Sequence, residues 1–142
     1  MKKIYLAGPI TGQPYAEELF NFAELEVKAL FSDNIEIINP MRLPHDHDKK
    51  WNSYMKECIA ELVYCDYIYM LNGWEASRGA RVEIELAKEL EITIYHQPRQ
   101  TLKERTAKLL DLYSSLGFID KYNLLASYTF TPHYESKKNK IK

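Results

Sequence analysis

The stretch from 67 to 90, YIYMLNGWEASRGARVEIELAKEL, decides the fold. It begins with a short apolar run, Tyr67 to Leu71, which is typical of a buried strand, and Asn72-Gly73 closes the run with a turn signal. From Ser77 to Leu90 the apolar residues recur at helical spacing. A strand followed by a helix of this length indicates a β-α-β unit, in which helices join parallel strands.

The same alternation continues on both sides of this stretch. We expect further strands at 3–7, 35–38 and 92–95, and further helices from Pro14 to about Leu30 and over 51–64. The last strands are uniformly apolar, which predicts that helices cover both of their faces. The sequence therefore predicts an α/β domain with a parallel sheet of four to five strands and helices on both sides.

Three segments of the chain differ in composition. Residues 1–98 carry the alternating strands and helices, so we expect them to form the ligand-binding core. Residues 99–136 contain an expected helix at 101–116 and an aromatic-rich stretch, and we expect them to pack on the core or on a partner subunit. The basic tail at 137–142 has four lysines and no acid, which is typical of a solvated terminus.

The composition excludes several classes of protein. With 142 residues, of which 46% are hydrophobic and 27% charged, the chain is in the range of one globular domain. Residues 1–136 hold 15 basic and 20 acidic residues, and this balance of −5 disfavours a nucleic acid polymer as partner. The apolar runs are far too short to predict a membrane span or a signal peptide. Two cysteines, Cys58 and Cys65, predict neither a disulfide framework nor a zinc site, so we expect a cytoplasmic setting.

Ligands of parallel sheets bind beyond the carboxyl ends of the strands, so the residues at those ends are binding candidates. They are Gly8-Pro9-Ile10, Asn39-Pro40 and Asn72-Gly73-Trp74. The sequence has no G-x-G-x-x-G and no Walker loop, which disfavours a dinucleotide or a triphosphate as ligand. The loop at 45–48, HDHD, has residue types that bind metals, but neighbouring side chains of an extended loop point apart. We therefore expect no metal and no cofactor.

Glu83 departs from its surroundings more than any other residue. At about 100° per residue it falls on the apolar face of its expected helix, with Ala80, Ile84, Leu86, Ala87 and Leu90. A carboxylate on a buried face is costly unless it is paired, hydrogen-bonded or open to a cleft. An ion pair with Arg78, or a hydrogen bond that caps its own helix, would meet that requirement and would give Glu83 a purely structural role. The alternative is a carboxylate at a functional site.

Three further groups of residues have both a structural and a functional interpretation. Ser77 is the expected N-cap of its helix, and its hydroxyl and the free amides of the first turn would also suit a phosphate. Gly8 and Gly79 would let the backbone approach a ligand closely. Trp51 and Trp74 either stack on a planar ligand or pack as ordinary core residues.

Two motifs together resemble the nucleoside 2-deoxyribosyltransferase superfamily. They are IYLAGPI at 4–10 and GWEASRGARVE at 73–83. The second motif, in the form G-W-E-x-S-x-G-A-x-x-E, is closest to a small branch of uncharacterised bacterial and phage proteins. The resemblance covers residues 1 to about 96, and it implies an enzyme that acts on nucleosides or nucleotides.

The resemblance also implies roles for individual residues. Glu83 would be the nucleophile, Tyr5 would hydrogen-bond and orient it, and Ser77 would hold the 5′-phosphate of a nucleoside monophosphate. The superfamily often has an aspartate where this chain has Cys58. Its transferases complete the active site of a neighbouring subunit with their C-terminal segment, which implies a homodimer or a larger homo-oligomer.

We therefore predict a flavodoxin-like or Rossmann-like three-layer domain that cleaves the N-glycosidic bond of a nucleoside or nucleoside monophosphate. A covalent glycosyl-Glu83 intermediate would form first, and water or a second base would then take the sugar. Two alternatives stay open: a non-catalytic nucleotide-binding module and an enzyme of the phosphoribohydrolase type. A pocket with no second acid near Glu83 would favour binding alone. The residues expected to contact the substrate are Gly8, Pro9, Ile10, Asn39, Gly73, Trp74, Ser77 and Gly79.

Overall fold

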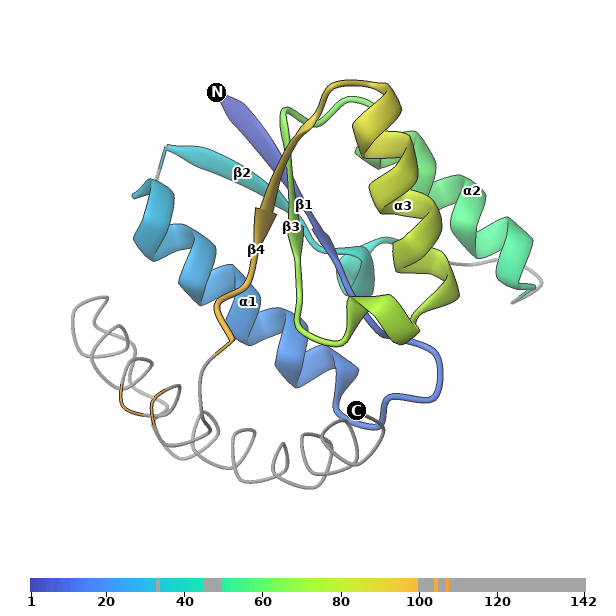
Figure 1. Cartoon of the computed structure of the whole chain (residues 1–142), viewed down its shortest axis with the longest axis horizontal. Helices are drawn as coiled ribbons and strands as arrows, with labels where there is room; N and C mark the ends of the chain where they lie inside the picture. The colour runs from blue at the N-terminus through green and yellow to red at the C-terminus, as the bar shows by residue number, and fades with distance from the viewer. Residues whose placement is uncertain (33, 45–49, 100–103, 105–106, 108–142) are drawn as a thin grey trace.

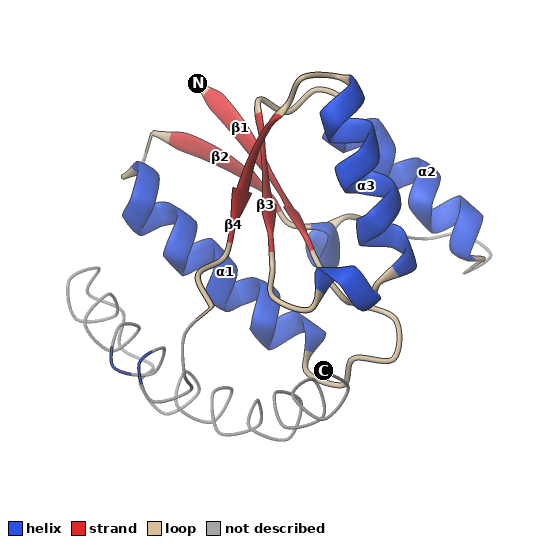
Figure 2. Ribbon diagram, viewed as in Figure 1, coloured by secondary structure: helices blue, strands red, loops and turns tan. Residues whose placement is uncertain are grey.

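The structure is a computed structural model, and it describes residues 1–32, 34–44, 50–99, 104 and 107. Strands and helices alternate along the described chain (Figure 2). The strands are β1 (Lys2–Ala7), β2 (Ile35–Ile38), β3 (Tyr67–Met70) and β4 (Thr93–His96). The helices are α1 (Ala16–Phe31), α2 (Trp51–Leu62) and α3 (Arg78–Glu89), with short 3₁₀ helices η1 (Pro40–Arg42) and η2 (Trp74–Ala76).

The four described strands form one parallel sheet in the order β2-β1-β3-β4. This confirms the predicted α/β class, and the bounds of the elements predicted up to residue 96 agree with the structure to within two residues. Helices cover both faces of the sheet (Figure 1). On one face α1 packs on Ile4 and Leu6 of β1, and on the other α2 and α3 pack on Tyr5 and Ala7. All four side chains are fully buried, as the alternation of side chains along a strand covered on both faces requires.

The central strand β1 determines where a ligand site can form. The next strand in the chain, β2, lies on one side of β1, whereas β3 lies on the other, so the strand order reverses at β1. At such a point the connections that follow neighbouring strands diverge and leave a crevice at the carboxyl ends of the strands. Here one connection begins after Ala7 at the end of β1 and the other after Met70 at the end of β3. The two strand ends lie side by side, since the amide of Leu71 donates a hydrogen bond to the carbonyl of Ala7 at 2.8 Å.

Two details differ from the sequence-based expectation. β4 is the outer strand of the described sheet, and its Thr93, Tyr95 and His96 are exposed, so helices do not cover both of its faces. Leu90, which was expected on the apolar face of its helix, is 48% exposed because α3 ends at Glu89 and Leu90 is its C-cap. Neither difference concerns the central strand β1.

Several predicted features lie outside the described residues: the HDHD loop at 45–48, the helix at 101–116, and the tail at 137–142. The aromatic-rich part of 99–136 lies outside them as well. Within the described part of the chain, no helix combines the length and the apolar character that crossing a bilayer requires. The same residues contain no cluster of three His, Cys, Asp or Glu side chains arranged to hold a metal ion.

Candidate active site

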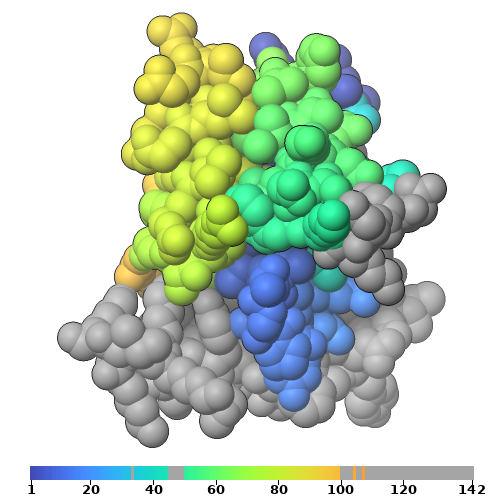
Figure 3. All heavy atoms as spheres, turned by 90° about the vertical axis from the view of Figure 1, so that its right-hand side faces the viewer, coloured from blue at the N-terminus to red at the C-terminus, as the bar shows by residue number. Residues whose placement is uncertain are grey.

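A cavity of about 310 Å³ lies beside the carboxyl end of β1, with walls from α2 and α3. Figure 3 shows the side of the molecule on which these two helices and the loop after β1 meet. The volume is at the lower end of the range for small-molecule sites. Its lining consists of Tyr5, Gly8, Pro9, Ile10, Thr11, Pro40, Trp51, Tyr54, Met55, Cys58, Ala76, Ser77, Arg78, Gly79, Ala80 and Glu83.

Glu83 faces this cavity from the second turn of α3 and is only 5% exposed. Its Oε2 atom accepts a hydrogen bond from the hydroxyl of Tyr5. Burial raises the pKa of Glu83 to about 8, and the hydrogen bond from Tyr5 opposes that increase. Among the described residues Glu83 has no ion pair with Arg78, whose guanidinium lies over the ring of Trp51 at 3.8 Å from the centroid. The buried carboxyl is therefore held by a phenol and opens onto a cavity.

Tyr5 reaches Glu83 from the central strand. It is fully buried, and the alternation along β1 directs its side chain to the face that α2 and α3 cover. Burial and the neighbouring Glu83 raise the pKa of Tyr5 well above its usual value, so the phenol stays protonated and donates. Tyr5 and Glu83, one from each predicted motif, are thus brought together as predicted.

Two more polar side chains form the wall on the side of α2. Tyr54 and Cys58 are one helical turn apart, and both line the cavity. Burial raises the pKa of Cys58 to about 11 and the pKa of Tyr54 further still, so both groups are neutral at pH 7. Among the described residues that line the cavity, Glu83 is the only carboxyl.

The N-terminus of α3 forms the opposite wall. The Oγ atom of Ser77 accepts a hydrogen bond from the amide of Ala80 at 3.2 Å, which confirms Ser77 as the N-cap. Ser77 and Arg78 both line the cavity. The dipole of the helix and the charge of the guanidinium both favour a negatively charged group at this end of the cavity.

Gly8 and Gly79 lie where the packing around the cavity leaves little room for a side chain. A Cβ atom at Gly8 would lie 2.8 Å from the Cβ of Leu71, and one at Gly79 would lie 3.0 Å from the sulfur of Met55. Their small size therefore lets the loop after β1 close on the end of β3, and lets α3 approach α2. A backbone contact from either glycine to a substrate stays a prediction.

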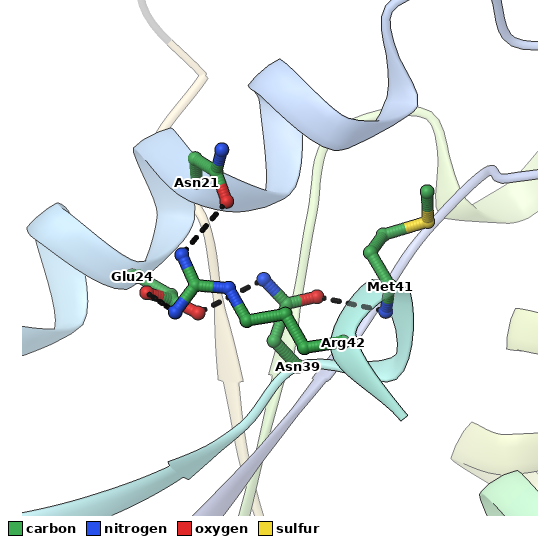
Figure 4. A network of polar contacts seen from close by, with 5 residues as sticks. All are labelled: Asn21, Glu24, Asn39, Met41 and Arg42. Atoms are coloured by element: carbon green, nitrogen blue, oxygen red, sulfur yellow. Dashed lines mark hydrogen bonds and ion pairs between the residues drawn. The ribbon is translucent and has the colours of Figure 1, made fainter. Parts of the chain in front are cut away.

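Asn39, a predicted substrate contact, lies outside the cavity lining and belongs to a buried polar network (Figure 4). Its Nδ2 donates to Oε1 of Glu24 at 2.9 Å, and its Oδ1 accepts from the amide of Met41 at 2.9 Å. Arg42 pairs with the same carboxylate at 3.1 Å. The network ties η1 to α1 and so holds Pro40 in the cavity wall, which gives Asn39 a structural role. A contact of Asn39 with a substrate stays a prediction.

Gly73 and Trp74 also lie outside the cavity lining. Gly73 has a φ of +90°, which other residues rarely adopt, and it makes the turn before η2. Trp74 is half-buried against the core beneath α2 and α3, and its ring centroid is 6.2 Å from that of His96. The tryptophan in the cavity wall is Trp51, the first residue of α2.

The structure adds lining residues that the sequence did not single out, among them Thr11, Tyr54 and Met55, and it places Pro40, a candidate from a strand end, in the same lining. Tyr54 had a usable signal, because it precedes Cys58 by one turn on the same face of the predicted helix. Thr11 and Pro40 follow two different strands, so only the assembled sheet brings these two residues to the same cavity.

The fold and the site define a class: a Rossmann-like α/β domain with a buried tyrosine–glutamate pair in a cavity at the end of its central strand. Residues 2–96 match the family described as a domain of unknown function, DUF4406. The match spans more than half of the chain, so the protein belongs to this family. A comparison with curated proteins found no match.

Proposed function

We propose that the protein cleaves the N-glycosidic bond of a nucleoside or nucleoside monophosphate, with Glu83 as the nucleophile. The observation that carries the proposal is the carboxyl of Glu83, which is buried, faces a ligand-sized cavity and is held by Tyr5. The resemblance to the nucleoside 2-deoxyribosyltransferase superfamily supports it, since that resemblance rests on the two motifs that contain Tyr5 and Glu83.

The proposed reaction has two steps. A carboxylate oxygen of Glu83 attacks the anomeric carbon, the carbon–nitrogen bond breaks, and the base leaves with the bonding electrons and takes up a proton. The sugar is then an ester on Glu83. In the second step water attacks the same carbon and the carboxylate is released; in a transfer reaction a second base takes the place of water.

The walls of the cavity suggest how a nucleotide would lie. The anion-favouring end at Ser77 and Arg78 suits a 5′-phosphate, which a hydroxyl, a guanidinium and helix amides would hold together. Tyr54 and Met55 form an aromatic and apolar part of the wall that suits a planar base, whereas the ring of Trp51 is in contact with the guanidinium of Arg78. The sugar would then lie between these two ends, next to Glu83.

The ionisation of Glu83 sets the expected pH dependence of the reaction. A nucleophilic carboxyl must be ionised, and burial raises the pKa of Glu83 in the empty cavity to about 8. The value of kcat/KM, which reports ionisation in the free enzyme, should therefore rise with pH and level off above about 8.

A covalent adduct tests the proposal. Nucleosides and nucleoside monophosphates with fluorine at the 2′-position slow the second step, so the sugar should accumulate on Glu83 and be found there by peptide mass. Glu83→Gln should give no adduct, whereas Glu85→Gln, on the exposed face of the same helix, should react like the wild type. Wild-type protein that releases base from such analogues while Glu83 stays unmodified would contradict the covalent step.

A second candidate function is a nucleotide-binding module without turnover. One observation favours it: Glu83 is the only carboxyl among the described lining residues, so the described wall holds no second carboxyl that could protonate a departing base. Calorimetric titration with monophosphates, followed by analysis of the recovered ligand, separates the two functions. Tight binding with intact ligand after long incubation would favour the module.

A further inference from the structure

Two side chains of the cavity wall contact each other where α2 and α3 begin. Trp51 is the first residue of α2, Arg78 is the first residue of α3, and both line the cavity. The Cζ atom of Arg78 lies over the ring of Trp51, 3.8 Å from its centroid, where the face of the ring attracts a guanidinium. The proposed function uses Arg78 to bind a phosphate and gives Trp51 no role of its own.

The indole of Trp51 also lies close to the first turn of α3. A Cβ atom at Gly79 would lie 4.0 Å from Nε1 of the indole and 3.0 Å from the sulfur of Met55, which is one turn further along α2. A side chain at Gly79 would therefore crowd Met55, and its absence brings the ring close to the helix that carries Arg78. The packing of α2 on α3 thus sets the position of the ring relative to the guanidinium.

The stacked guanidinium keeps its hydrogen-bond donors available for a ligand. The five N–H groups of arginine lie in the plane of the guanidinium, so contact with a ring through the flat face does not use them. Within the described part of the chain, no oxygen atom accepts a hydrogen bond from Arg78. Glu83, the only carboxyl among the described lining residues, is held by Tyr5 instead. A phosphate suits such donors, because two of its oxygens can accept two parallel hydrogen bonds from one guanidinium.

We propose that Trp51 is a positioning residue that holds the guanidinium of Arg78 in place for the 5′-phosphate of a nucleoside monophosphate, and that this pair makes the protein prefer monophosphates to nucleosides. The side chain of Arg78 is exposed. An exposed arginine samples many rotamers, and fixing one of them when the ligand binds costs affinity. The ring of Trp51 fixes the guanidinium before the ligand arrives, so less of this cost remains at binding. Trp51 thus acts on the phosphate through Arg78.

The inference rests on the proposed function for the identity of the ligand, but its test needs no turnover. The probes are ribose 5-phosphate and 2-deoxyribose 5-phosphate, with the two unphosphorylated sugars as their counterparts. These compounds have no N-glycosidic bond, so the protein can only bind them. If no base is ever released from a nucleotide, the proposed cleavage fails while the binding measurement still decides the role of Trp51.

The experiment is an NMR titration of full-length protein labelled with ¹⁵N. The chain has two tryptophans, and Trp74 lies outside the cavity lining, so its indole signal is an internal control for that of Trp51. Both sugar phosphates should shift the indole signal of Trp51 and leave that of Trp74 unchanged. The unphosphorylated sugars should shift neither signal at the same concentration. The backbone amide signals at the start of α3 give the dissociation constant in every variant.

Substitutions separate the roles of the two side chains. Arg78→Gln should raise the dissociation constant of the sugar phosphates at least about tenfold, since it removes charge-assisted hydrogen bonds. Trp51→Leu should raise it about two- to fivefold, the range of a cation–π contact at an exposed site, and Trp51→Phe by less. In protein that carries Arg78→Gln, Trp51→Leu should have no further effect, because no guanidinium is left to hold. The matched control is Arg81→Gln, since Arg81 donates to the carbonyl of Glu75 at 2.9 Å and lies outside the cavity lining. This control should bind like the wild type.

Three results would overturn the proposal. One is an affinity that Trp51→Leu leaves unchanged, or lowers by the same factor with and without Arg78→Gln. The second is an affinity that Arg78→Gln lowers no more than Arg81→Gln does. The third is wild-type protein whose signals respond to neither sugar phosphate. Should Trp51→Leu fail to fold, Trp51→Phe takes its place in the same comparison, because it keeps an aromatic side chain at this position.

Discussion

Replacing Glu83 by glutamine should remove a large pH dependence from the stability of the protein. Burial raises the pKa of Glu83 from 4.5 to about 8, so between these pH values the folded protein holds a proton that the unfolded chain has lost. This contribution to stability is complete below about pH 4.5 and is lost as the pH rises through about 8. Each pH unit in the window lowers the free energy of unfolding by about 1.4 kcal/mol, and the whole window by about 5 kcal/mol.

Urea unfolding followed by circular dichroism, between about pH 5 and pH 8.5, measures this effect. With a denaturant slope of about 1–3 kcal/mol/M, the urea midpoint of the wild type should fall relative to that of Glu83→Gln by about 0.5–1.4 M per pH unit. Glu85 is the matched control, since its side chain is 70% exposed on the same helix, and Glu85→Gln should follow the wild type. Parallel curves for wild type and Glu83→Gln would show that Glu83 titrates as an ordinary carboxyl and would refute the reasoning.

Three further predictions concern single side chains. Tyr5→Phe should raise the pKa of Glu83, because it removes the opposing hydrogen bond, and should move the rising limb of the pH–rate profile upward while leaving turnover above that of Glu83→Gln. Ser77→Ala should cost about 1 kcal/mol in urea unfolding as a lost N-cap, and should weaken calorimetric binding of monophosphates by about 1.5–3 kcal/mol more than binding of nucleosides. Asn39→Ala should lower the free energy of unfolding by about 1–3 kcal/mol in urea unfolding, because the Glu24 carboxylate loses a buried partner. A variant with lower substrate affinity but unchanged stability would contradict the structural role of Asn39.

The order and type of the described elements could be predicted from the sequence because each is marked locally. Ser77 has a side chain that caps α3, and Gly73 provides the left-handed turn before η2. The exposure of β4 at the edge of the described sheet could not be predicted, since the position of a strand in the sheet depends on contacts between distant segments. The sequence at 92–95, ITIY, includes Thr93 and is compatible with an outer strand as well as with a buried one.

The candidate site could be predicted where one residue violated a local pattern. Glu83 stood out as a carboxyl on an apolar helix face, and the structure buries it there. Asn39 follows a strand in the same way as Gly8 does, yet it turns to Glu24 on α1, and no local signal distinguishes the two directions. The contact between Arg78 and Trp51 joins the start of α3 to the start of α2, so it becomes visible only in the assembled fold.

The most direct test of the proposed chemistry is the release of free base from a panel of ribo- and deoxyribonucleosides and their 5′-monophosphates. Chromatography of the reaction mixtures would compare wild type, Glu83→Gln and Glu85→Gln at about pH 8, where a substantial fraction of Glu83 is ionised. We predict base release by the wild type and by Glu85→Gln, and at least about a thousandfold less by Glu83→Gln, since that variant lacks the nucleophile. Base release that is the same in Glu83→Gln as in wild type, or no release by the wild type from any member of the panel, would contradict the account.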